Sequence, residues 1–241
     1  MEYNDRFIQN GLTEEDDLTC LPLLQGLTST ELKKARGVLH RKWLSAGQIL
    51  LSEDQPGENV YFLANGAVRI CVQRGGHDVI IGLHGRGDII GELSVIDGAA
   101  RSATVITQTS CLVYRVSHED FWNVLWEIKP FSRNLARLMA RRVRLLTSQV
   151  EAMASLSVQA RLARQIWILA QDHGCPAGQP DAPHAIAIPF RLTQGDLANM
   201  VGATRVQINQ VFCQWKRRNI IELRDNLVIV LDQEALRAFV V

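Results

Sequence analysis

The sequence lacks the features that mark several classes of protein. Its five cysteines are far apart and form no C-x-x-C pair, which argues against a disulfide framework and a structural zinc site. The six histidines form no close pair, so we expect no metal. No apolar run approaches the ~20 residues of a membrane helix, and the acidic N-terminus lacks the apolar core of a signal peptide. We therefore expect a cytoplasmic protein with no membrane partner.

Catalytic signatures are missing as well. The chain has no P-loop, no nucleophile–base motif and no metal-ligand spacing. We therefore expect a binding protein, and an enzyme remains the alternative that a DNA-binding assay would test.

The 241 residues carry a formal net charge of +1, which says nothing about nucleic acid until it is divided along the chain. Residues 1–130 hold 12 basic and 17 acidic side chains. Residues 131–156 hold 5 basic and 1 acidic side chains, and residues 157–241 hold 9 basic and 7 acidic ones. The basic surplus lies in the C-terminal part, where a DNA-binding region would use it.

The most informative stretch runs from Gly91 to Val105. Glycine at 91 allows a close approach of backbone to a ligand, and the Glu92 carboxylate can accept hydrogen bonds from sugar hydroxyls. Arg101 offers a planar fork of donors that matches a phosphate, and Ser102 adds a hydroxyl. The stretch can therefore hold a small anionic sugar. The alternative is a turn closed by an ion pair between Glu92 and Arg101.

The chain around this stretch is predicted to be a β-roll. From residue 41 to residue 116, short apolar runs alternate with glycines, which is typical of short antiparallel strands. The runs are 48–51, 59–64, 68–72, 79–83 and 112–116, and Gly75-Gly76 is a hairpin turn. Before them we expect short helices at 18–27 and from Ser29, and after them a helix capped near Ser117.

A long helix is predicted next, with Pro130 in its first turn. Its apolar residues recur at alternating steps of four and three, the pattern of a coiled-coil seam: Met139, Val143, Leu146, Val150 and Met153. Arginines border this seam, which favours pairing with a second copy across a two-fold axis. The alternative is a helix that packs only on its own β-roll.

The C-terminal part has the pattern of a winged helix-turn-helix. Thr193 and Thr204 each stand at a helix start, and Gly202 supplies the turn between the two helices. Ile208, Val211, Phe212 and Trp215 form the buried stripe of the second helix. Its opposite face presents Arg205, Val206, Asn209 and Gln210, which are base-reading types. The alternative is two ordinary packed helices with a polar outer face.

Two flanking segments complete this part. Residues 172–189 are predicted to be a long loop, and two strands around Asp225-Asn226 to be the wing. A helix capped by Ser157 connects the long helix to this region.

Gly91-Glu92-Leu93 followed by Arg101-Ser102-Ala103 resembles the phosphate-binding cassette of cyclic-nucleotide-binding domains. With the helix-turn-helix, the chain resembles the cAMP-receptor/FNR (Crp-Fnr) superfamily of bacterial transcription regulators, closest to the cyclic-nucleotide-binding cAMP receptor proteins. The resemblance implies an α+β fold: an antiparallel β-roll, a long dimerisation helix and a C-terminal winged helix-turn-helix. The expected boundaries are 1–130, 131–156 and 157–241. The scattered cysteines argue against the iron–sulfur members, and haem is not expected.

The resemblance also assigns a ligand site for cAMP, cGMP or both. It implies that Glu92 holds the ribose 2′-hydroxyl and that Arg101 and Ser102 hold the cyclic phosphate. The assigned residues are Gly91, Glu92, Leu93, Arg101, Ser102, Arg142, Thr147 and Ser148. In the family a Thr-Ser pair on the dimer helix contacts the base, but Leu146 stands at the Thr position here. Thr147, or alternatively Ser148, would have to hydrogen-bond the base, which predicts weak discrimination between adenine and guanine.

The same resemblance implies a homodimer that binds a palindromic operator in double-stranded DNA and acts with RNA polymerase. The expected DNA-binding residues are Thr193, Gln194, Thr204, Arg205, Val206, Gln207, Asn209 and Gln210. Arg205 matches an arginine of the family, whereas Val206 and Gln210 replace a glutamate and a second arginine. A regulator whose cassette has lapsed, sensing another signal or none, remains the alternative.

Overall fold

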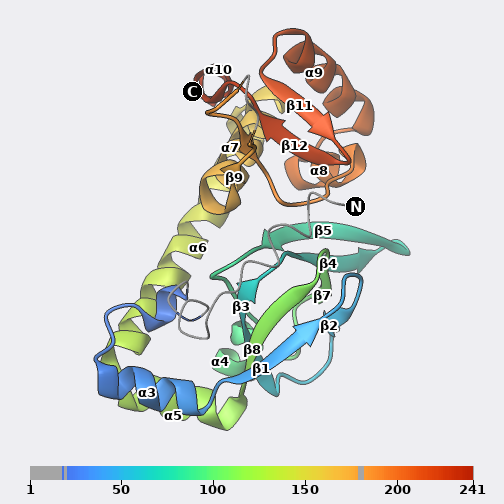
Figure 1. Ribbon diagram of the computed structural model, residues 1–241. Helices are drawn as coiled ribbons and strands as arrows, with labels where there is room; N and C mark the ends of the chain where they lie inside the picture. Colours follow the sequence, from blue (N-terminus) through green and yellow to red (C-terminus); the bar gives the residue numbers. More distant parts are fainter. Residues whose placement is uncertain (1–17, 19–20, 179–181, 241) are drawn as a thin grey trace. The chain divides into compact units, whose positions relative to one another are not determined.

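The computed structural model describes residues 18, 21–178 and 182–240. Its described residues form three antiparallel sheets and two compact units (Figure 1). Apart from three residues of one strand, the first unit extends to Arg144 and the second begins at Leu145. The division therefore falls inside a single long helix, and each unit is described by itself below.

The first unit contains the predicted β-roll. Its elements are η1 (Pro22–Leu24), α3 (Ser29–Gly37), β1 (His40–Leu44), β2 (Ile49–Leu51), β3 (Asn59–Asn65), β4 (Val68–Arg74), β5 (His77–His84), β6 (Ile89–Ile90), α4 (Glu92–Asp97), β7 (Thr104–Thr107), β8 (Cys111–Ser117), α5 (His118–Glu127) and the first part of α6 (Lys129–Ser155). One sheet has the strand order β1-β8-β3-β6 and the other β2-β7-β4-β5.

The five predicted strands are present, and the predicted hairpin turn joins β4 to β5. Gly75 and Gly76 both have positive φ, 60° and 79°, as a two-residue turn of this kind requires. Strands β1, β6 and β7 were not predicted. Strand β1 has four exposed residues in succession and no apolar alternation, so its pairing with β8 defines it.

The predicted helix at 18–27 holds at Leu18, which is helical, but is wrong for residues 21–27, where η1 spans three residues. The turn ends at Gln25, whose backbone is extended with a ψ of 136°, and Gly26 follows in the left-handed region with a φ of 72°. Helix α3 begins at Ser29, and Thr28 caps it in a reciprocal pair with Glu31. Residues 19 and 20 lie outside the described residues.

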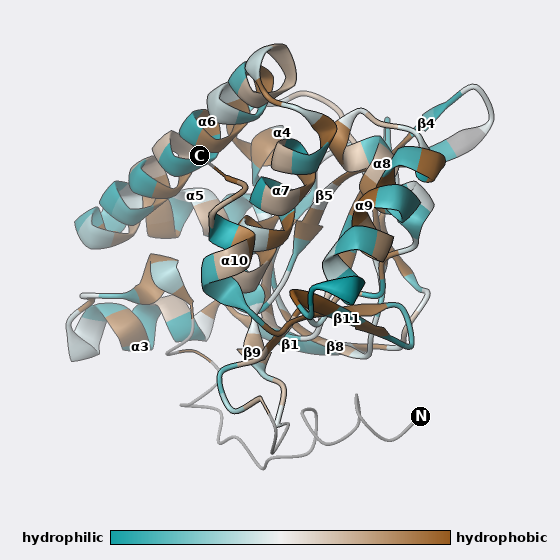
Figure 2. Ribbon diagram, turned by 90° about the horizontal axis from the view of Figure 1, so that it is seen from above, coloured by the Kyte–Doolittle hydropathy of each residue, from teal (hydrophilic) through white to brown (hydrophobic). Residues whose placement is uncertain are grey.

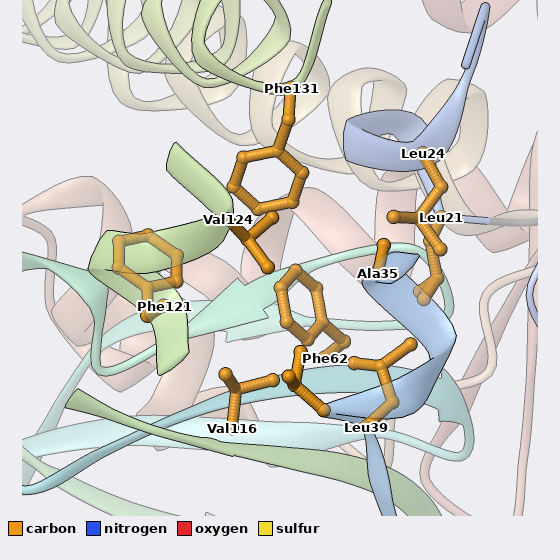
Figure 3. A pocket seen from close by; sticks show the side chains of 10 residues that line it. Leu21, Leu24, Ala35, Leu39, Phe62, Val116, Phe121, Val124 and Phe131 are labelled. Carbon is orange, nitrogen blue, oxygen red and sulfur yellow. The ribbon is translucent and has the colours of Figure 1, made fainter. Parts of the chain in front are cut away.

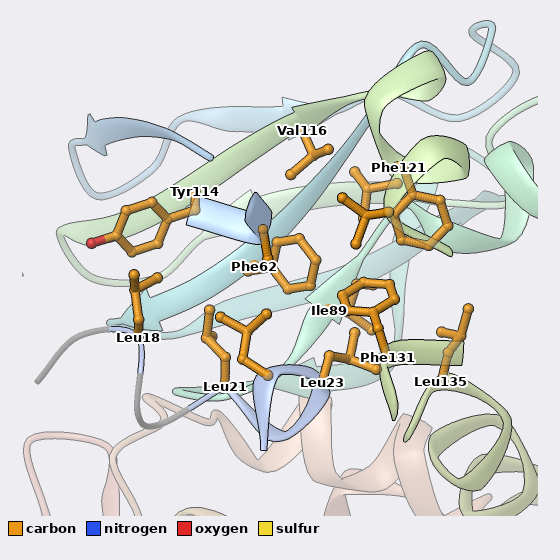
Figure 4. Packing of buried hydrophobic residues seen from close by; sticks show 14 of the residues in the cluster. Leu18, Leu21, Leu23, Phe62, Ile89, Tyr114, Val116, Phe121, Phe131 and Leu135 are labelled. Carbon is orange, nitrogen blue, oxygen red and sulfur yellow. The ribbon is translucent and has the colours of Figure 1, made fainter. Parts of the chain in front are cut away.

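The main apolar core of the first unit joins the β-roll to α6. Figure 4 shows Phe62 from β3, Phe121 from α5 and Phe131 from α6 in this core. The ring of Phe131 lies edge-on to both of the others, at centroid distances of 6.4 and 5.9 Å. This packing fixes the first turns of α6 against the β-roll.

A small apolar cavity lies in the same core. Figure 3 shows that Leu21, Ala35, Phe62 and Phe131 are among the side chains that point into it. It has room for about one water molecule, so a nucleotide cannot occupy it.

The second unit contains the predicted winged helix-turn-helix. Its elements after α6 are α7 (Val158–His173), β9 (Cys175–Pro176), β10 (Ile186–Ala187), α8 (Gln194–Val201), α9 (Arg205–Arg217), β11 (Ile221–Arg224), β12 (Leu227–Val230) and α10 (Gln233–Arg237). The sheet order is β11-β12-β10-β9. Asp225 and Asn226, both with positive φ, form the predicted turn of the wing.

The predicted loop at 172–189 needs correction, because it holds two short strands. β9 pairs with β10, and β10 pairs in turn with β12. Four small or apolar side chains hold them in place: Ala177, Ala185, Ala187 and Ile229. Strands of two residues are too short to show a period in the sequence.

Helix α6 connects the two units in the sequence, and its 27 residues correspond to about 40 Å. Figure 2 shows hydrophilic residues recurring along it. In the part of the chain that the structure describes, no helix is long and apolar enough to cross a membrane.

Candidate functional site

The predicted cassette is built around Gly91, which precedes α4. Its φ of 80° lies in the left-handed region, which favours glycine. A Cβ added here would lie 2.6 Å from Nη1 of Arg101 and 3.0 Å from a methyl of Leu51. Gly91 is therefore required both by its conformation and by the side chain packed against it.

Arg101 is almost completely buried, with 5% of its surface exposed. Its Nη1 donates to the carbonyl of Gly91 and its Nη2 to the carbonyl of Asn59, both at 2.6 Å. Its backbone N–H donates to Gln55 O at 2.8 Å, and its carbonyl accepts from Asp54 N at 3.0 Å. Both the side chain and the backbone of Arg101 are thus held in place.

Burial disfavours the charge of Arg101, and nearby acidic groups offset only part of this effect. Burial lowers the pKa of Arg101, while Tyr61, Glu92 and Glu58 raise it. Because arginine stays protonated in proteins, the site keeps a buried cation. A guanidinium has five N–H groups, so the two bonds to carbonyls leave three for an anionic ligand.

Glu92 opens α4 and is 2% exposed. Its carboxylate forms an ion pair with Arg142 of α6, and Arg142 Nη2 also donates to the carbonyl of Ile89 at 2.8 Å. The alternative of a turn closed by Glu92 and Arg101 is therefore wrong. Instead the structure brings Glu92 together with Arg142, which lies 50 positions later in the sequence.

The other predicted ligand residues are placed less tightly. Leu93 and Ser102 are exposed in the first unit. Thr147 is exposed in the second unit, where the Ser148 hydroxyl accepts a hydrogen bond from Arg164 of α7. The Ser148 hydroxyl is thus already engaged within its own unit.

Most of the predicted seam is exposed along α6. Val143, Leu146, Val150 and Met153 are between 47% and 68% exposed. Met139 differs, since it packs against the core of the first unit. A run of exposed apolar residues on one helix face is typical of an interaction surface.

Two capping boxes position the helix-turn-helix. The Thr193 hydroxyl accepts from Asp196 N at the start of α8, and the Thr204 hydroxyl accepts from Gln207 N at the start of α9. Gly202, with a φ of 61°, ends α8 and makes the turn. These features confirm the predicted helix starts.

The predicted buried stripe of α9 is confirmed, and so is its exposed opposite face. The buried residues are Ile208, Val211, Phe212 and Trp215. The exposed ones are Arg205, Val206, Gln207, Asn209 and Gln210. Gln194 Nε2 of α8 donates to Asn209 Oδ1 at 3.2 Å, which connects two of the predicted DNA-binding residues.

The role of Arg161 was not predicted from the sequence. This side chain of α7 donates to the carbonyls of Leu156, Val201 and Gly202, at 2.8, 2.7 and 3.0 Å. It therefore links the end of α6 to the turn of the helix-turn-helix. Carbonyls at helix ends lack partners within the helix and favour a cation, but the partners lie up to 41 positions away.

Two regions of the chain match the models of known protein families. The cyclic nucleotide-binding domain matches residues 41–127, and the Crp-like helix-turn-helix domain matches residues 160–239. These ranges contain the cassette and the two capped helices.

Individual relatives agree with these matches. The chain is 27% identical over 191 residues to a CRP-like cAMP-activated global transcriptional regulator of Mycobacterium tuberculosis, covering 79% of this chain and 83% of that protein. It is 26% identical over 184 residues to the cAMP-activated global transcriptional regulator CRP of Salmonella typhimurium, covering 75% of this chain and 84% of that protein. The solved structure of FixK2 from Bradyrhizobium japonicum is similar, with a TM-score of 0.70 at 18% identity. The match covers 84% of this chain and 97% of that chain.

Proposed function

Because the chain belongs to the CRP/FNR family of transcription regulators, we propose that it is a homodimeric DNA-binding regulator controlled by a cyclic nucleotide. It has the cyclic-nucleotide-binding domain and the Crp-like helix-turn-helix, and its relatives are transcription regulators rather than enzymes. The observation that carries the proposal is the ion pair of Glu92 with Arg142. It joins the cassette to the helix that also carries the seam.

The proposed ligand is cAMP, held by its sugar and phosphate. The N–H groups that Arg101 does not use on Gly91 and Asn59 can bind the cyclic phosphate bidentately. Glu92 has two carboxylate oxygens, so the pair with Arg142 leaves acceptor capacity for the ribose 2′-hydroxyl. Ser102 is exposed next to Arg101 and can add a hydroxyl donor.

We further propose weak discrimination between cAMP and cGMP. Leu146 cannot hydrogen-bond a base edge, so Thr147, or alternatively Ser148, is the proposed base contact. The Ser148 hydroxyl accepts a hydrogen bond from Arg164, and a hydroxyl whose proton rotates can donate to guanine or accept from adenine. A preference for cAMP beyond about a hundredfold, some 2.7 kcal/mol, would contradict this assignment.

The dimer is proposed on the exposed apolar residues of α6. Val143, Leu146 and Val150 are all more than 60% exposed in the single chain. Burying such residues against a second copy is favourable, and steps of four and three are those of a coiled-coil seam. One helix then carries both the seam and the ligand contact. The nucleotide can therefore shift the equilibrium between different arrangements of the two helix-turn-helix units.

The proposed operator is an inverted repeat with half-sites about one helical turn apart. Arg205 can bind a guanine bidentately, Val206 can touch a thymine methyl, and Gln210 suits adenine. The half-site should therefore keep the guanine read by Arg205 and have A·T pairs at the other two positions. Selection from random DNA in saturating nucleotide tests this, and RNA polymerase is the proposed partner at the promoter.

Calorimetry with cAMP and cGMP, followed by DNA mobility shifts with and without each nucleotide, tests the whole proposal. We expect Arg101→Ala to weaken nucleotide binding tenfold or more, because a charge-assisted hydrogen bond contributes about 1.5–3 kcal/mol. The exposed Arg74→Ala is the matched control and should bind normally. DNA binding that is equally tight without nucleotide would exclude the gating and favour a lapsed cassette.

A further inference from the structure

Helix α6 carries a row of positive side chains that the proposed function does not use. We call Lys129, Arg133, Arg137, Arg141 and Arg144 the α6 basic ridge. They follow one another at steps of four, four, four and three, so they lie on one side of the helix, and all five are exposed. No acidic residue occurs between positions 128 and 150.

The ridge is separate from the seam and from the nucleotide contact. Arg137, Arg141 and Arg144 each stand two positions before a seam residue, which is about 200° around the helix axis. Arg142, which pairs with Glu92, points to a third side. The ridge would therefore stay exposed when the seam is buried in a dimer.

Four of the five ridge residues have no counter-charge in the described part of the chain. No described carboxylate forms an ion pair with Lys129, Arg133, Arg137 or Arg144, although Lys34 of the same unit pairs with Glu127. Neighbouring like charges on a helix repel one another. A negatively charged occupant would relieve this repulsion.

The N-terminal segment of the chain has the complementary charge. Residues 1–17 contain six acidic side chains and one basic one, and residues 14–17 are four consecutive acids. The segment is joined to Leu18, which is buried in the core of the first unit. Asn134, the residue after Arg133, donates to the carbonyls of Leu23 and Gln25. The acidic run is thus tethered to the same unit that carries the ridge.

We propose that the acidic N-terminal segment, residues 1–17, docks on the α6 basic ridge. Exposed ion pairs are individually weak and sensitive to salt, but the tether gives the segment a high effective concentration at the ridge. The ridge spans about 22 Å along the helix, which an extended segment of this length can follow at about 3.3 Å per residue. Docking would keep the ridge away from nucleic acid and other polyanions.

Zero-length cross-linking of the full-length chain tests the docking. Arg133→Lys and Arg137→Lys keep the charge of the ridge and supply amines that a carbodiimide couples to nearby carboxylates. We expect cross-links from positions 129, 133 and 137 to Glu14, Glu15, Asp16 or Asp17, and a several-fold loss of them in 1 M salt, where screening is short-ranged. The Lys34–Glu127 ion pair is the internal positive control.

Two further results decide the proposal. Neutralising the run with Glu14→Gln, Glu15→Gln, Asp16→Asn and Asp17→Asn should remove the ridge cross-links and keep the one between Lys34 and Glu127. If the ridge amines couple only to other carboxylates, or to none while the control forms, the proposal is overturned.

DNA is the competing occupant of the ridge. The salt dependence of DNA binding distinguishes a ridge occupied by the N-terminal segment from a ridge occupied by DNA. With the segment docked, Arg133→Gln combined with Arg137→Gln should leave the salt dependence of DNA binding unchanged. A reduction of the slope by about 1–2, the loss of one or two phosphate contacts, would assign the ridge to DNA and overturn the docking.

Discussion

The two units present the side chains of their proposed sites in opposite ways. In the first, Glu92 and Arg101 are 2% and 5% exposed, and each is held by neighbouring groups. In the second, Arg205 and Gln210 are exposed on a helix whose other side forms the core, and Val206 is 66% exposed. Sites for small molecules are concave, whereas a helix that reads DNA must protrude into the major groove.

Because of this difference, mutations should affect affinity and stability together in the first unit and separately in the second. In the first unit the residues that would bind the ligand also hold the fold together, so changing one affects affinity and stability at once. In the second unit the core and the reading face lie on opposite sides of α9, so the two properties can be changed independently. Four predictions follow from this contrast, in order of expected effect.

The largest effect should come from Trp215→Ala in the core of the second unit. Trp215 is fully buried, and its rings lie 6.2 Å from Phe212 and 5.7 Å from Phe239. Its indole N–H has no partner among the described residues, so the loss is one of packing, about 3–5 kcal/mol. We expect calorimetry to show a destabilised second unit, with DNA binding lost and nucleotide binding kept.

Phe121→Ala in the first unit is the reciprocal variant, since Phe121 is 1% exposed. It should weaken nucleotide binding as well as stability. Equal losses of both activities in both variants would show that the units do not unfold separately.

Arg142→Gln should destabilise the first unit by about 2–3 kcal/mol, because it leaves the buried carboxylate of Glu92 without its cation. Adding Glu92→Gln should restore much of the loss, since the uncompensated charge is then gone. Urea unfolding measures both, with the exposed Arg115→Gln of β8 as control. A double variant no more stable than Arg142→Gln would mean that the ion pair is not the cause.

Thr28→Ala and Thr204→Ala compare the same capping box in the two units. Each should cost about 1 kcal/mol of stability, because one helix start loses its cap. Thr204→Ala should also weaken DNA binding, whereas Thr28→Ala should leave it unchanged. Mobility shifts at a temperature where both variants are folded check this, and an equal loss of affinity in both would contradict a role of Thr204 at DNA.

The smallest effect concerns alkaline pH. Burial raises the pKa of the Cys111 thiol, so in the folded protein it stays protonated at pH values where the unfolded thiol, with a pKa of about 8.5, ionises. Its contribution to stability is therefore complete below that pH and is lost as the pH rises further. Unfolding at pH 7 and pH 10 should show a smaller decline for Cys111→Ala than for the wild type.

The exposed thiol of Cys213 provides the control for this comparison. Cys213→Ala should decline with pH as the wild type does. A decline in Cys111→Ala equal to that of the wild type would place the alkaline sensitivity elsewhere.

Local signals predicted the local structure well. Ser117, Ser157, Thr193 and Thr204 each cap a helix as their sequence context indicates. The apolar spacing in α9 predicted its buried residues, because the spacing and the buried face both depend only on two or three turns of one helix. The fold class was accessible for the same reason, since most elements have a recognisable period or a turn residue.

The candidate site was predictable in its residue types but not in its contacts. Glu92 and Arg142 are 50 positions apart, and Arg161 reaches carbonyls up to 41 positions away. No periodic pattern encodes such distances, because they depend on how elements pack. β9 and β10 were missed for a related reason, since pairing with other strands rather than their own composition defines them.

Gly91 also sets a limit on how this protein could be adapted as a biosensor for other nucleotides. A Cβ at this position would lie 2.6 Å from the guanidinium of Arg101, in a backbone conformation that side chains rarely adopt. A library that varies Gly91 would therefore disturb the proposed phosphate contact before it altered the choice of base. Directed evolution of ligand preference is better concentrated on positions 146 to 148, where sequence diversity leaves Arg101 in place.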